Sequence, residues 1–176
     1  MIIESNSEKE TYELGKRLGQ KAEAGQVYTL IGDLGVGKTV LTQGLAAGLE
    51  IHEPVNSPTF TIVQIYEEGR MPFYHFDVYR IGDIEEMDEI GYEDYFYGNG
   101  VTMIEWANLI EEILPETYRE VQIEKDLEKG GMPHWQEKFF FRKKKKAVIS
   151  GIAAAGSLAL TGAILLMYRH KIGHAA

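Results

Sequence analysis

The sequence contains no cysteine among its 176 residues, so it offers no disulfide, no thiolate metal site and no thiol nucleophile. No apolar run follows Met1, because charged residues from Glu4 to Glu10 interrupt it, and no secretory signal peptide is expected. Basic residues are scarce before Phe139, where 11 Lys and Arg stand against all 27 Asp and Glu. Such an acidic surface repels a phosphate backbone, so any RNA in the protein's function is expected to be held by a partner.

The C-terminal part has the opposite composition. From Phe139 onward there are seven basic residues and no acidic one, and residues 147–168 form a run of roughly 22 residues without a charge. That length can cross a bilayer, and small residues four apart, Gly151, Ala155 and Ala159, are typical of membrane-helix contacts. We predict a P-loop domain over 1–129, a basic and aromatic linker over 130–146, a transmembrane helix over 147–168 and a short tail over 169–176. The alternative for 147–168 is a buried core helix rich in Ala and Gly.

The most informative segment is Gly-Asp-Leu-Gly-Val-Gly-Lys-Thr at residues 32–39. It follows a β-rich apolar run over 27–31 and precedes a helical pattern over 40–49, which is the context of a phosphate-binding P-loop. Its glycines let successive backbone N–H groups face one anion, and the start of the helix adds a favourable field. Lys38 can reach the β and γ phosphates, and the Thr39 hydroxyl can bind Mg²⁺. The predicted nucleotide-binding residues of the loop are Gly32, Asp33, Leu34, Gly35, Val36, Gly37, Lys38 and Thr39.

The remaining pattern predicts an α/β fold. We expect helices over 8–23, 40–49, 83–97 (broken at Gly91) and 108–114. We expect strands over 27–31, 61–66, 73–77, 101–104 and 121–123, the second and third forming a hairpin.

Two carboxylates end predicted strands, where an open α/β sheet places its ligand groups. Either Asp77 or Glu105 can hold Mg²⁺ or orient the attacking water. Thr59 lies in a proline-constrained loop and is a candidate sensor of a γ-phosphate. His75 is expected to be structural, and Trp106 to lie in the core or to stack on a partner or base.

Four motifs occur together in one order: the P-loop, Ser57-Pro58-Thr59-Phe60, His-Phe-Asp-Val-Tyr-Arg at 75–80 and Ile104-Glu105-Trp106. In this the chain resembles the TsaE-type P-loop ATPases of bacterial tRNA threonylcarbamoyladenosine synthesis, over about residues 5–125. The resemblance implies a three-layer P-loop domain with a mainly parallel sheet and an antiparallel hairpin.

The resemblance also implies cofactors, site residues and partners. It implies ATP on Lys38, Mg²⁺ on Thr39 and Glu105, a switch-like role for Thr59, a catalytic role for Asp77 and a place near the nucleotide base for Thr11. It implies a partner heterodimer, TsaB–TsaD, which modifies tRNA adenosine 37 and which ATP hydrolysis would reset between turnovers. Contact with tRNA would then be indirect.

The sequence departs from the family after about Lys129. Family members close the domain with a strand that carries an arginine near the nucleotide, and here the candidate is Arg142. The family is soluble, so the apolar run is either an added anchor or material joined by a change of reading frame. The expected location is the cytoplasm, with a tail anchor in the cytoplasmic membrane if the run is genuine.

Other functions are weaker fits. A GTPase-like switch lacks an Asn-Lys-x-Asp motif to read guanine. A small-molecule P-loop kinase usually carries a lid with several arginines, and only Arg70 and Arg80 lie between the P-loop and residue 118. A membrane-tethered module that binds nucleotide without turnover stays open.

Overall fold

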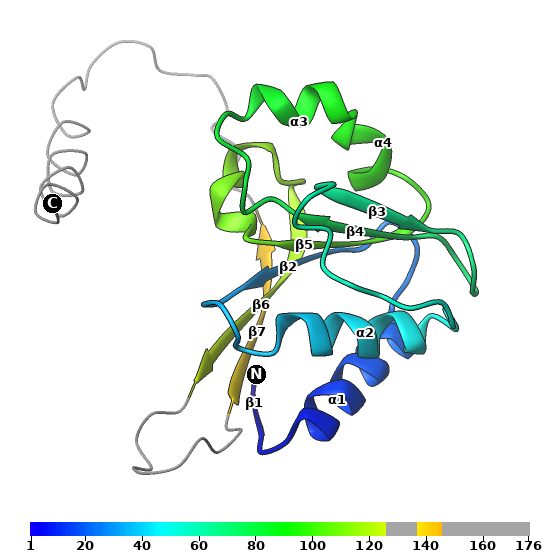
Figure 1. Cartoon of the computed structure of the whole chain (residues 1–176), viewed down its shortest axis with the longest axis vertical. Helices are drawn as coiled ribbons and strands as arrows, with labels where there is room; N and C mark the ends of the chain where they lie inside the picture. Colours follow the sequence, from blue (N-terminus) through cyan, green and yellow to red (C-terminus); the bar gives the residue numbers. More distant parts are fainter. Residues whose placement is uncertain (126–136, 146–176) are drawn as a thin grey trace, which may run out of the picture.

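The structure, a computed structural model, describes residues 1–125 and 137–145 (Figure 1). Its helices are α1 (Glu8–Lys21), α2 (Lys38–Gly48), α3 (Glu85–Ile90) and α4 (Tyr92–Phe96), with 3₁₀ turns η1 (Ala107–Leu109) and η2 (Glu111–Ile113). Its strands are β1 (Ile2–Ser5), β2 (Val27–Ile31), β3 (Val63–Tyr66), β4 (Phe73–Asp77), β5 (Val101–Glu105), β6 (Thr117–Lys125) and β7 (Glu137–Lys145).

The strands form one mixed sheet in the order β1-β7-β6-β2-β5-β4-β3. The central strands β6, β2, β5 and β4 run parallel to one another. Antiparallel strands complete both edges, β3 beside β4 on one side and β7 and β1 beside β6 on the other. The expected parallel sheet is therefore confirmed at the centre, and the antiparallel hairpin of β3 and β4 lies at one edge.

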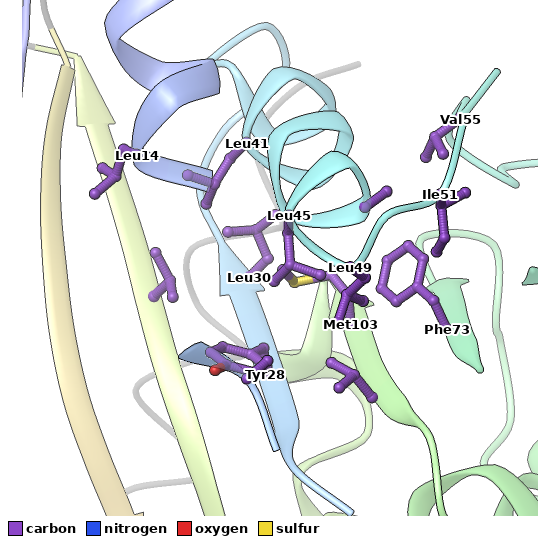
Figure 2. Packing of buried hydrophobic residues seen from close by; sticks show 14 of the residues in the cluster. Leu14, Tyr28, Leu30, Leu41, Leu45, Leu49, Ile51, Val55, Phe73 and Met103 are labelled. Atoms are coloured by element: carbon purple, nitrogen blue, oxygen red, sulfur yellow. The ribbon is translucent and has the colours of Figure 1, made fainter. Parts of the chain in front are cut away.

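Helices cover both faces of this sheet, which makes three layers (Figure 1). On one face, Leu41 and Leu45 of α2 and Leu49, which follows it, pack over Leu30 and Met103, and all five side chains are fully buried (Figure 2). Burial of each such side chain contributes about 1.5–3 kcal/mol. The sheet and α2 thus hold the P-loop, which connects β2 to α2, on a rigid support.

The opposite face is packed by α3, α4 and the 3₁₀ turns. Phe76 of β4 meets Phe96 of α4 edge to face, with ring centroids 5.4 Å apart. Phe73, three residues earlier, belongs to the α2 side, because residues an odd number apart on a strand point to opposite faces. Both faces of β4 and β5 are therefore buried, and their last residues, Asp77 and Glu105, are 3% exposed.

Glycines allow α1 and α2 to pack backbone against backbone. A Cβ built on Gly15 would collide with the carbonyl of Leu41, and one on Gly44 would collide with the carbonyl of Tyr12. The same holds for Gly19 and Gly48. Ser7 caps the start of α1, where the Glu10 backbone N–H donates to the Ser7 hydroxyl at 3.2 Å. The close glycine contact was not predicted.

The C-terminal part requires a correction. Residues 137–145 fall within the expected linker, but they form β7, which pairs with β6 along nine residues and with β1. β6 itself is longer than the expected 121–123, and β1 was not expected at all. The predicted helix over 147–168 lies outside the described residues. Within the parts that are described, no helix is long and apolar enough to cross a membrane.

Candidate nucleotide-binding site

The P-loop occupies the turn between β2 and the first residue of α2. Gly35 and Gly37 have φ values of 72° and 79°, a left-handed backbone that only glycine adopts without strain. This geometry turns the loop back on itself before Lys38 begins α2. The N–H groups of the first turn of a helix have no partner within the helix, so they are free to bind an anion.

Lys38 lies over the loop that it follows. Its ammonium donates to the carbonyls of Gly32 and Asp33, both at 2.8 Å, and stands 4.2 Å from the centre of the Trp106 ring. Burial lowers the pKa of Lys38, and the negative charges of Glu105, Asp77 and Asp33 offset part of that shift. The side chain therefore stands between carbonyl oxygens on one side and an acidic group of residues on the other.

Asp77, the last residue of β4, is held in place by three donors. The Ser57 and Thr59 hydroxyls donate to its Oδ2 at 2.5 and 2.7 Å, and the Tyr79 backbone N–H donates to its Oδ1 at 3.1 Å. Hydrogen bonds to an ionised carboxylate are stronger than those between neutral groups. The loop that carries Thr59 is thereby fixed to the end of β4. Ser57 was not among the predicted site residues, although it begins the Ser-Pro-Thr-Phe motif.

Glu105 ends β5 and is paired in register with Asp77 on the adjacent parallel strand. It is buried, and its Oε1 lies 2.9 Å from Nε2 of His75, which is fully buried one strand away. A carboxylate can only accept, so Nε2 carries the hydrogen of this bond. His75 is therefore structural, as expected, and its contact fixes the orientation of Glu105.

These groups line one cavity of about 410 Å³. The lining residues are Leu34, Gly35, Gly37, Lys38, Thr39, Val40, Ser57, Thr59, Asp77, Glu105 and Trp106. Of the other predicted loop residues, Gly32 and Asp33 bind Lys38 through their carbonyls, and Val36 is buried in the core. The structure thus brings Lys38, Thr39, Thr59, Asp77 and Glu105 to a single opening.

The oxygen donors in this cavity suit Mg²⁺. A hydroxyl from Thr39 and a carboxylate from Glu105 are hard ligands, and Mg²⁺ bound with a nucleotide takes its other ligands from phosphate and water. Among residues 1–125 and 137–145 no group of three or more His, Cys, Asp or Glu side chains forms a metal cage. The donor set therefore fits a Mg²⁺ ion that takes further ligands from phosphate and water.

Two residues beside the cavity have a strained backbone. Trp106 and Ile62 have φ values of 63° and 65°, which bulky side chains rarely adopt. Trp106 follows Glu105, and Ile62 ends the loop that carries Thr59. Strain of this kind costs about 1–3 kcal/mol per residue and is common at functional sites.

Thr11 lies on the other side of the P-loop and is not among the described residues that line the cavity. Its hydroxyl donates to Oε2 of Glu137 at 3.0 Å, and Glu137 packs against Gly37. Burial raises the pKa of Glu137, and the bond from Thr11 and the charge of Lys125 offset part of that shift. Glu137 was not predicted, because it falls in the stretch expected to be a linker.

The expected closing arginine does not reach the nucleotide site. Arg142 pairs in register with Glu120, and its guanidinium lies 3.8 Å from that carboxylate. Arg142 is five positions along the strand from Glu137, which is about 17 Å at about 3.4 Å per residue. The end of β7 at the P-loop carries Glu137, so an acidic side chain stands there.

Comparison with known proteins agrees with this geometry. The family described as "Threonylcarbamoyl adenosine biosynthesis protein TsaE" matches residues 5–132. The chain belongs to the TsaE family. The TsaE protein of Bacillus subtilis is 48% identical over 116 residues, which cover 66% of this chain and 72% of that protein. The TsaE protein of Treponema pallidum is 43% identical over 112 residues, covering 64% and 82%.

A solved structure supports the same assignment. The crystal structure of YdiB from Bacillus subtilis superposes with a TM-score of 0.68 at 36% sequence identity, covering 83% of this chain and 86% of that one. The resemblance inferred from four short motifs is therefore confirmed for the family. The roles of single site residues, the cofactors and the partners remain predictions.

Proposed function

We propose that this TsaE-family chain binds and hydrolyses Mg²⁺-ATP, and that it serves the threonylcarbamoyl modification of tRNA adenosine 37. The observation that carries the proposal is the shared cavity, in which a P-loop lysine and hydroxyl face two strand-end carboxylates. Curated TsaE proteins related to this chain are named for tRNA threonylcarbamoyladenosine biosynthesis. The chemistry of the cavity and the family therefore point to one role.

Each side chain has a distinct task in this proposal. The backbone N–H groups of the P-loop and Lys38 hold the phosphates, and Thr39 and Glu105 would hold Mg²⁺, which neutralises charge on the transferred phosphoryl group. His75 keeps Glu105 oriented. Asp77 positions the attacking water, since the hydroxyls of Ser57 and Thr59 fix its carboxylate. Thr59 thus connects its loop to the state of the nucleotide.

Exposed apolar residues around the cavity favour a protein partner. Phe60 is 84% exposed, Leu34 72% and Tyr79 50%, and they belong to the Thr59 loop, the P-loop and the segment after Asp77. Apolar side chains gathered at one place on a surface are typical of interaction sites. We infer that a TsaB–TsaD-type heterodimer covers this rim, and that hydrolysis resets that complex while tRNA contacts the partner.

The experiment is an ATPase assay with the chain alone and with a purified TsaB–TsaD pair. We expect slow hydrolysis alone and faster hydrolysis with the pair. Asp77→Asn should lower the stimulated rate about 100-fold, while Asp94→Asn, an exposed aspartate of α4, should not change it. No hydrolysis under either condition would contradict the ATPase role. Equal rates with and without the pair would contradict the partner.

A further inference from the structure

The second acidic element of the site is Glu137, at the start of β7. It faces the P-loop from the side opposite Asp77 and Glu105. A Cβ built on Gly37 would stand 2.5 Å from Oε1 and 2.7 Å from Oε2 of Glu137. The carboxylate is therefore in direct contact with the backbone of the last glycine before Lys38.

Few described groups compensate this carboxylate. Glu137 is 3% exposed, and Thr11 is the one side chain of the described residues that the structure shows donating to it. Lys125 is its partner in the register of β6 and β7, but a Cβ on Gly35 would lie 3.8 Å from the Lys125 ammonium, so that charge stands at the middle of the P-loop. Burial raises the pKa of Glu137, and this effect is larger than the lowering by the Thr11 hydrogen bond or by the Lys125 charge.

We propose that Glu137 sets nucleotide affinity, its negative charge opposing the phosphates that the P-loop attracts. This rests on the proposed nucleotide-binding function. The amides that follow Gly37 are those that bind phosphate in a P-loop, and a carboxylate beside them reduces the favourable field at the start of α2. Like charges a few ångströms apart in a partly desolvated site repel strongly. The chain therefore holds ATP and ADP less tightly than its P-loop alone would, which speeds their release.

The test is calorimetric titration of Mg²⁺-ATP and of Mg²⁺-tripolyphosphate into the wild-type chain and the Glu137→Gln variant. Glutamine keeps the shape and removes the charge. We expect affinity for both ligands to rise about tenfold or more. Glu124→Gln is the matched control, because it removes the same charge from an exposed position at the end of β6 and should change affinity less than twofold. Glu137→Met serves as a second neutral variant if the amide does not fold.

Unchanged affinity in a folded Glu137→Gln variant would overturn the proposal. Weaker ATP binding with unchanged tripolyphosphate binding would also overturn it, because the carboxylate would then contact the nucleoside. Failure of the wild-type chain to bind ATP would contradict the proposed function separately. If the wild-type chain does not bind ATP but the Glu137→Gln variant does, the effect of the charge is supported. If neither chain binds ATP, the effect of the charge is rejected.

Discussion

The two sides of the P-loop carry the same chemical group in different surroundings. On the cavity side, Asp77 accepts three hydrogen bonds and Glu105 is oriented by His75. On the opposite side, Glu137 is held by Thr11 and packs against Gly37. Burial raises the pKa of Glu137, and the hydrogen bond from Thr11 and the charge of Lys125 offset part of that shift.

This difference separates catalysis from affinity. The cavity-side carboxylates lie at the carboxyl ends of β4 and β5, where the proposed Mg²⁺ and attacking water would bind. Glu137 instead contacts the backbone of the loop at Gly37, and we propose that it acts there through its charge. Mutations on the cavity side are therefore expected to change the rate of ATP hydrolysis, and mutations of Glu137 to change the affinity for nucleotide.

The largest effect is expected from Glu105→Gln. The amide is a poorer ligand for Mg²⁺ and carries no charge, so ATP hydrolysis should fall about 100-fold and should require more Mg²⁺. Rates measured over a range of Mg²⁺ concentrations check this. Glu93→Gln, on the exposed surface of α4, is the control and should match the wild-type chain. A Glu105→Gln variant with the wild-type rate would exclude Glu105 from the metal site.

Removing the hydrogen bond between His75 and Glu105 should lower the stability of the fold. His75→Phe keeps a buried ring but leaves the Glu105 carboxylate without its donor, which should lower the free energy of unfolding by about 1–3 kcal/mol. Urea denaturation at neutral pH measures the loss. His52→Phe changes an exposed histidine and should have little effect. Equal stability of the two variants would mean that the bond to His75 contributes nothing.

Contact between Glu137 and Gly37 can be tested by a double-mutant cycle. Gly37→Ala should destabilise the chain by about 1–3 kcal/mol, because alanine is strained at a φ of 79° and its Cβ meets the carboxylate. Glu137→Ala should remove the contact with the carboxylate and leave the backbone strain. Gly37→Ala should therefore lower the stability less in the Glu137→Ala background than in the wild-type chain. Strictly additive losses in thermal unfolding would show that the two residues do not touch.

The smallest effect concerns stability and pH. Folding raises the pKa of Glu137 through burial, against the opposing influences of Thr11 and Lys125. The stabilising contribution of the protonated form is complete below the unfolded pKa, about 4.3, and is lost as the pH rises through the folded pKa. Glu137→Gln should therefore melt at a higher temperature than the wild-type chain at pH 8 and at the same temperature near pH 3.5. A constant difference at all pH values would contradict this.

Much of the cavity side could be predicted from local sequence. The strands 27–31 and 73–77 were predicted with the bounds that they have, and Lys38, Thr39, Asp77 and Glu105 lie at the ends of elements with strong patterns. The other side depends on distant pairing. β7 is held by β1, far away in the sequence, and its run of Phe139, Phe140 and Phe141 before four lysines hides the alternation of a strand. The pairing of β7 with β6 and β1 places Glu137 at the P-loop.

The central claim, that this P-loop holds a nucleotide triphosphate, is tested most directly by calorimetric titration of Mg²⁺-ATP into the wild-type and Lys38→Ala chains. Lys9→Ala, on the exposed face of α1, is the control. The account predicts saturable binding to the wild-type chain and to Lys9→Ala, and loss of binding by about 100-fold or more in Lys38→Ala. Equal binding by folded wild-type and Lys38→Ala chains, or no binding by either, would contradict it.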